Sequence, residues 1–187
     1  MKSVIKLMSA LMAFAILLST NSFAQEKRFI VSGASMSPSK TIIEYSVKSK
    51  QLTTFVAAVK AAGLADTLSG AGPFTVFAPT NQAFNKLPKG TVTMLLKPES
   101  KDALTKVLTN HVVGGKINST ELMNMIKNNG GSYKVKTLQG GGLTFMLKEK
   151  NIFITDEKGS ISKITIADVN QSNGVVHIIN TVLMPKS

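Results

Sequence analysis

The chain has 187 residues, a formal net charge of +12 and no cysteine. Without cysteine it can form no disulfide and has no thiol nucleophile or lipid-modified cysteine, so an exported form must rest on its hydrophobic core. Arg28 is its only arginine, its lysines are scattered, and it has no tryptophan. Nucleic-acid readers usually cluster basic residues on one face, with arginine or aromatic side chains for the bases, so this composition argues against nucleic acid as a partner.

The first 24 residues have the layout of a secretory signal peptide. Lys2 and Lys6 form a basic start, and Ser22-Phe23-Ala24 is a small-x-small cleavage site. The apolar run between them, Leu7 to Leu18, has 12 residues, whereas a membrane-spanning helix needs about 20. We therefore predict that the mature form begins at Gln25, spans no membrane, and works outside the cytoplasm, either in the periplasm or released.

Residues 25–39 are polar and are predicted to form a flexible leader, with an N-terminal strand over Phe29-Ile30-Val31 as the alternative. Residues 40–187 are predicted to form a single domain, since they contain no internal repeat and are enough to bury a core.

Helical patterns come first in this domain. Apolar residues recur at helical spacing from Leu52 to Val59, and Gly63 is a plausible end of that helix. Phe74–Ala78 has the composition of a buried strand, and Thr80 or Asn81 is expected to cap a short helix after it. Further along the chain, helices are predicted at Val92–Leu96, at Ala103–Leu108 and from Ser119 or Thr120 onward, and an extended segment at His111–Val113.

The last third of the chain is predicted to be strands. They are expected at Tyr133–Leu138, Leu143–Lys148, Ile152–Ile154, Ile164–Val169 and Val175–Ile179. Asn173-Gly174 is a strong hairpin signal before the last of them. Helices followed by a run of strands indicate an α+β fold rather than a parallel βαβ alternation.

Three stretches, in order and at matching spacing, resemble the fasciclin-like domain family. They are a first signature at Gly72–Phe84 (GPFTVFAPTNQAF), a central segment at Leu108–Val113 (LTNHVV) and a closing signature at Asn173–Pro185 (NGVVHIINTVLMP). The resemblance implies a wedge-shaped β-sandwich with several short helices packed on it. It also implies a non-enzymatic extracellular module of cell adhesion that contacts matrix or cell-surface polysaccharide or protein.

Two residues depart from the family pattern. Asn110 stands where the central segment commonly has tyrosine, and Asn180 stands where the closing signature commonly has aspartate. In animal members the Tyr-His pair is linked to integrin contact, so integrin binding is not transferred to this chain. Asn110 and His111 are the candidate binding residues, with a purely structural role for His111 as the alternative. At Asn180, loss of the carboxylate is expected to alter a local hydrogen bond more than the fold.

No constellation in the sequence predicts catalysis, a metal or a cofactor. His111 and His177 lack further ligands at workable spacing, and neither an HExxH motif nor a Gly-x-Ser-x-Gly elbow is present. We expect both imidazoles to hydrogen-bond within the core. Asn118-Ser119-Thr120 fits the glycosylation pattern, although helix capping is the favoured explanation.

An alternative function is carriage of an apolar small molecule such as a carotenoid. It is motivated by the family association and by methionines, which suit irregular apolar cavities. Those predicted to fall on apolar faces are Met94, Met123, Met125, Met146 and Met184.

Overall fold

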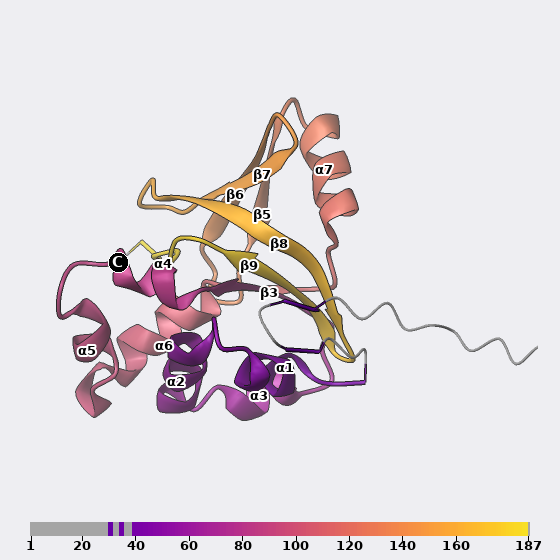
Figure 1. Cartoon of the computed structure of the whole chain (residues 1–187). Coiled ribbons are helices and arrows are strands. Elements are labelled where there is room, and N and C mark those ends of the chain that lie inside the picture. The colour runs from indigo at the N-terminus through magenta and orange to yellow at the C-terminus, as the bar shows by residue number, and fades with distance from the viewer. Residues whose placement is uncertain (1–29, 32–33, 36–38, 187) are drawn as a thin grey trace, which may run out of the picture.

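The computed structural model describes residues 30–31, 34–35 and 39–186 (Figure 1). The predicted signal peptide, residues 1–24, lies outside the described residues. Within the predicted leader, β1 (Ile30–Val31) pairs antiparallel with β2 (Ala34–Ser35), which agrees with the strand alternative for part of this segment. Flexibility of residues 25–39 stays a prediction.

Most of the helices lie together on one side of the sheet, and α7 stands apart on the other side (Figure 1). Their bounds are α1 (Ile42–Lys48), α2 (Thr53–Ala62), α3 (Ala65–Ser69), α4 (Asn81–Asn85), α5 (Thr91–Leu95), the 3-10 turn η1 (Pro98–Ser100), α6 (Lys101–Thr109) and α7 (Ser119–Asn128). As predicted, Gly63 ends α2 in the left-handed conformation, with φ of 72°, and Thr80 caps α4.

The remaining strands form one seven-stranded sheet in the order β4-β3-β9-β8-β7-β6-β5. Their bounds are β3 (Phe74–Pro79), β4 (Val112–Gly114), β5 (Ser132–Lys136), β6 (Gly142–Lys148), β7 (Asn151–Thr155), β8 (Ile161–Gln171) and β9 (Gly174–Ile179). Only β3 and β9 pair in parallel; the other neighbours in this sheet are antiparallel. Every residue of β9 is buried, as expected of a strand covered on both faces.

The sheet folds over on itself along β8. The pairing of β8 with β9 shifts register between Ile164 and Ile166 and again before Val169, and such irregularities bend a strand and increase its twist. The two edges of the sheet approach each other, because Leu138 N, just after β5, donates to Val112 O of β4 at 2.8 Å. The two layers of the sandwich are therefore halves of one nearly closed sheet.

Two hydrophobic clusters fill this frame. The first packs α1, α2, α3, α4 and α6 onto one face of β3 and β9, with Phe55 and Val76 among its fully buried members. The second lies inside the folded sheet under α7, where the ring centroids of Phe77 and Phe145 are 5.2 Å apart. Val76 and Phe77 are successive residues of β3, so their side chains point to opposite faces of the sheet and belong to different clusters.

The α+β class and the helices packed on the sheet are confirmed, and three local predictions need correction or addition. The helices α1 and α3 are present where no separate helix was predicted. The cap of α7 is Asn118 rather than Ser119 or Thr120: its Oδ1 accepts from Glu121 N at 2.8 Å, and the Glu121 carboxylate accepts from Asn118 N. This reciprocal capping box supports the capping explanation for the Asn118-Ser119-Thr120 pattern.

Candidate functional site

A polar pocket lies where the two parallel strands β3 and β9 end. Register pairs Pro79 with Ile179, and Thr80 N donates to Ile179 O at 3.2 Å. The first signature continues from β3 into α4, and the closing signature continues from β9 into the C-terminal segment. The two signatures therefore lie side by side in space, although they are about a hundred residues apart in sequence.

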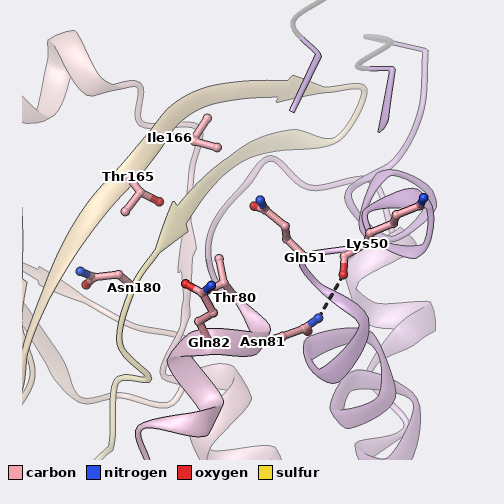
Figure 2. Close-up of a pocket in the computed structure, with 8 residues that line it drawn as sticks. All are labelled: Lys50, Gln51, Thr80, Asn81, Gln82, Thr165, Ile166 and Asn180. Carbon is pink, nitrogen blue, oxygen red and sulfur yellow. Dashed lines mark hydrogen bonds between the residues drawn. The ribbon is translucent and has the colours of Figure 1, made fainter. Parts of the chain in front are cut away.

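The pocket has a volume of about 420 Å³ and is open to solvent (Figure 2). Its lining residues are Lys50, Gln51, Thr80, Asn81, Gln82, Thr165, Ile166 and Asn180. Three glutamine or asparagine side chains of this set come from the α1–α2 connection and α4, and β8 supplies two residues from the opposite wall (Figure 2). Seven of the eight lining residues have a polar side chain, and no carboxylate is among them.

Asn81 fixes one wall of the pocket by three hydrogen bonds. Its Oδ1 accepts from Thr54 N at 3.0 Å, its Nδ2 donates to Lys50 O at 3.0 Å, and its own N donates to Gln51 O at 2.8 Å. These bonds attach the loop between α1 and α2 to the start of α4. The wall that carries Lys50 and Gln51 is thereby preformed.

Asn180 fixes the other wall. Its Oδ1 accepts from Lys163 N at 2.9 Å, and its backbone oxygen accepts from Lys86 Nζ at 2.7 Å. The side-chain oxygen thus makes a bond that a carboxylate would also make, so replacement of the family's aspartate is compatible with the fold. The site gains positive charge from Lys50 and Lys86 without a compensating acid among its lining residues.

The groups that line this pocket are hydrogen-bond donors and acceptors without the arrangement of a hydrolytic site. A hydrolytic site needs a nucleophile in contact with a base that is itself oriented by a third group. The lining hydroxyls belong to Thr80 and Thr165; Thr80 Oγ1 accepts from Ala83 N, and Thr165 Oγ1 donates to Ile178 O. No histidine or acid lines the pocket. Side-chain amides, hydroxyls and an ammonium group instead match the donors and acceptors of a hydroxyl-rich ligand.

The predicted binding residue His111 lies in the core with 1% of its surface exposed. Its Nε2 accepts from Leu183 N at 2.9 Å, so the proton is on Nδ1, which donates to Val107 O at 2.8 Å. Burial lowers the pKa of His111 to about 4, against smaller opposing effects of the Val107 bond and Asp156. This geometry supports the structural role.

The predicted binding residue Asn110 is also 1% exposed. Its Nδ2 donates to Leu183 O and its Oδ1 accepts from Thr137 Oγ1, both at 3.4 Å. Asn110 and His111 together attach the C-terminal segment to the end of α6. A partner would reach either side chain only if that segment moved, so their binding role stays a prediction.

Ser119, Asp168 and His177 come together without any local sequence signal. The Asp168 carboxylate accepts from Ser119 N at 2.7 Å and from the Ser119 hydroxyl. His177 Nδ1 accepts from the backbone N of Asp168 at 3.3 Å, and its Nε2 donates to Ile117 O at 2.9 Å. In a catalytic triad the imidazole contacts both the serine and the carboxylate. Here both ring nitrogens are bonded to backbone groups instead, and burial lowers the pKa of His177. The three residues fasten α7 to β8.

Two further properties concern the described part of the chain. Residues 30–31, 34–35 and 39–186 contain no cluster of three histidine, aspartate or glutamate side chains that could hold a metal ion. Over the same ranges, no helix has the length and apolar character needed to cross a membrane.

Comparison with known proteins identifies the family. The model of the Fasciclin domain matches residues 50–185. Protein sll1483 of Synechocystis sp. is 44% identical over 183 residues, which cover 95% of this chain and 93% of that protein. The cell surface glycolipoprotein MPB83 of Mycobacterium bovis is 36% identical over 122 residues, covering 65% of this chain and 48% of that protein.

The fold also agrees with a solved structure. A FAS1 domain pair from the insect cell adhesion molecule Fasciclin I superimposes with a TM-score of 0.71 at 16% identity, covering 79% of this chain and 51% of that chain. At this identity the likeness concerns the fold alone. The family match extends from the α1–α2 connection to the C-terminal segment and includes the three resembling stretches. This chain belongs to the fasciclin domain family.

Proposed function

We propose that this chain is an exported, non-enzymatic adhesion module that binds polysaccharide at a cell or matrix surface. The observation that carries the proposal is the polar pocket at the ends of β3 and β9, because its amide, hydroxyl and ammonium groups suit a hydroxyl-rich ligand. The predicted signal peptide at residues 1–24 supports export. Relatives named as a cell surface glycolipoprotein and a cell adhesion molecule support a role at a surface. A surface protein presenting polar groups is the other class of partner that this site would accept.

The test is binding of the exported full chain to a panel of neutral and acidic polysaccharides and to whole cells. The pocket variant combines Lys50→Ala with Gln82→Ala. The matched control combines Lys48→Ala with Asn85→Ala, exposed residues of α1 and α4 that do not line the pocket. We expect the pocket variant to bind at least about tenfold more weakly, since each lost hydrogen bond is worth about 1 kcal/mol and one to a charged group more. Equal binding by the pocket and control variants would refute the pocket as the site.

Carriage of a carotenoid or another apolar molecule stays the alternative. The pocket gives it little support, because Ile166 is the one purely apolar residue in the lining. Two of the five methionines predicted to lie on apolar faces, Met94 and Met146, are 61% and 37% exposed instead. Protein purified from its natural source should have no visible absorption band; a band that extracts into organic solvent would favour the carrier.

A further inference from the structure

The outer face of β5 to β8 carries lysines in a regular array. In the register of the sheet, Lys134 of β5 is paired with Thr144, which is paired with Thr155, and that row ends at Ile161 of β8. The next row runs from Ser132 through Met146 and Phe153 to Lys163. Residues paired in register point to the same face of a sheet, so the two rows share this surface. Lys136 and Lys148 continue it at either end.

This face is open to solvent among the described residues. The opposite face of the same strands buries Phe145 and Ile154, and α7 packs against β5 and β6 on that buried side. On the outer face, Lys134, Lys136 and Lys148 are exposed and Lys163 is half-buried. Four neighbouring strands span about 14 Å, and alternate residues along a strand lie about 7 Å apart. The lysines therefore surround a strip about 14 Å wide.

The strip carries an excess of positive charge. Its two rows contain no aspartate or glutamate, and these four lysines form no ion pair with any described residue. Two carboxylates lie at its margin: Glu149 directly follows Lys148 in the turn between β6 and β7, and Glu157, in the turn between β7 and β8, accepts through Oε1 from Gly142 N at 3.0 Å. The helical side differs, because acids lie among its lysines: Glu44 on α1, Asp66 on α3, Glu99 on η1 and Asp102 on α6.

A hollow of about 380 Å³ marks one end of the strip. It is lined by Lys134, Lys136, Glu157 and the glycine turn Gly140–Gly142. The Lys134 side chain lies directly over Gly142, since a Cβ built on Gly142 would come within 2.0 Å of Lys134 Cε. The glycine therefore allows the lysine stem to lie flat on the sheet with its ammonium group at the hollow.

We propose that this strip, the outer face of β5 to β8, binds the negatively charged groups of an acidic polysaccharide. The inference rests on the proposed function and adds a second surface, distinct from the polar pocket. Lysine offers a compact point charge with three donors, which suits carboxylate or sulfate groups spread along a chain. Thr144 and Ser132 add hydroxyls between the charges. Phe153 offers an apolar patch in the centre.

An anionic lipid surface fits the strip less well. Peripheral membrane binding combines basic residues with apolar side chains that enter the lipid. Here the apolar side chains are Ile161, 57% exposed at the edge of the strip, Met146, 37% exposed, and the half-buried Phe153, and they lie on the strands of a sheet rather than on one face of an amphipathic helix. Vesicles are therefore included in the test as the competing partner.

The experiment compares two triple variants of the exported full chain with equal change of net charge. The strip variant carries Lys134→Gln, Lys136→Gln and Lys163→Gln. The control carries Lys60→Gln, Lys89→Gln and Lys106→Gln, all exposed on the helical side. The probes are polygalacturonate, dextran sulfate, uncharged dextran and phosphatidylglycerol vesicles, each at several salt concentrations. Thermal unfolding of every variant checks that the fold is retained.

We expect the strip variant to bind the two acidic polysaccharides at least about tenfold more weakly than the control. The slope of log affinity against log salt concentration should become shallower by about two to three, one for each charge contact removed. Equal losses of affinity in the two triple variants would overturn the strip as the binding surface, because such losses would reflect net charge alone. Tighter binding to the vesicles than to the acidic polysaccharides would overturn the choice of partner.

A pair of single substitutions tests the centre of the strip. Met146→Glu and Val47→Glu both place a carboxylate at an exposed apolar position, 37% and 51% exposed, but only Met146 lies in the strip. Met146→Glu should weaken binding to dextran sulfate several-fold, and Val47→Glu should not. If the wild type binds polysaccharide through the polar pocket while every strip variant binds normally, the strip is not a binding surface and the proposed function stands. If the wild type binds no polysaccharide, both fail.

Discussion

His111 Nε2 accepts a hydrogen bond from the backbone N–H of Leu183 at 2.9 Å, which joins the end of α6 to a segment 72 residues later. The bond is completely buried, and Nδ1 of the same ring donates to Val107 O. One imidazole therefore satisfies a donor and an acceptor of the backbone at the place where the C-terminal segment meets the core. This geometry supports the structural alternative for His111, the histidine of the central segment.

Replacing this ring should destabilise the protein. His111→Leu introduces an apolar side chain of similar size and leaves Leu183 N–H without its acceptor. Removing one partner of a buried hydrogen bond costs about 1–3 kcal/mol. Denaturant unfolding should show this loss, and Lys60→Leu, an exposed substitution on α2, serves as the control. A loss no larger than that of the control would contradict the structural role.

Stability should fall as the pH is lowered from about 6.5 toward 4. The pKa of His111 is about 4 in the folded protein, because burial disfavours the charged ring, against an unfolded value of 6.5. The unfolded state therefore binds a proton first, and the contribution of His111 to the free energy of unfolding is full above pH 6.5 and is lost between these two values. His177, whose pKa is also lowered by burial, acts in the same direction.

Chemical denaturation at several pH values measures this dependence. The wild type should lose stability across that range, and His111→Leu should lose less, because one of the two buried rings is gone. Identical profiles of stability against pH for the two proteins would show that His111 does not contribute to the pH dependence.

Phe74 has a glycine as its cross-strand partner on each side, and only one of these two glycines should be indispensable. Phe74 is paired with Gly114 of β4 on one side and with Gly174 of β9 on the other. A Cβ on Gly174 would lie 2.0 Å from the backbone oxygen of Phe74, whereas a Cβ on Gly114 would have its nearest neighbour, a side-chain atom of Leu138, at 4.0 Å.

Gly174→Ala should therefore destabilise the protein by more than about 3 kcal/mol, at the upper end of the range for single substitutions, because the clash is with backbone rather than with a flexible side chain. Gly114→Ala should change the free energy of unfolding by less than about 1 kcal/mol. Comparable thermal midpoints for the two variants would contradict the pairing of β3 with β9.

Tyr45→Phe should be neutral or stabilising. Tyr45 is 1% exposed, its hydroxyl has no hydrogen-bond partner among the described residues, and burial raises the pKa of Tyr45 to about 12. A buried polar group without a partner costs about 1–3 kcal/mol, which the substitution removes. A clear loss of stability on thermal unfolding would show that the hydroxyl has a partner.

The sequence predicted those features that local chemistry encodes. Gly63 ends α2 because glycine adopts the left-handed conformation without a steric penalty, and Thr80 caps α4 through its own side chain. The short helices α1 and α3 escape prediction because five to seven residues give too little periodicity. Tyr45 of α1 is nevertheless among the largest fully buried side chains.

The sites depend on relations that no local pattern reveals. Asn173 has the signature of a hairpin turn, yet its side chain also accepts from Ile42 N and donates to Leu68 O and Gly70 O, which holds α1 and α3 against the turn. The polar pocket likewise combines Lys50, Gln82 and Asn180 from separate segments. The parallel pairing of β3 with β9 brings such residues together, and no local pattern encodes that pairing.

The central claim, that the chain is a surface-binding module, is tested most directly by a salt titration of its binding to acidic polysaccharide. The exported full chain should bind polygalacturonate or dextran sulfate saturably at low salt. Its affinity should fall at least about tenfold as the salt rises from about 0.05 M to 0.5 M, since exposed charges are screened over about 8–10 Å near 0.1–0.15 M salt. Absence of binding to every polysaccharide and to whole cells at low salt would contradict the account.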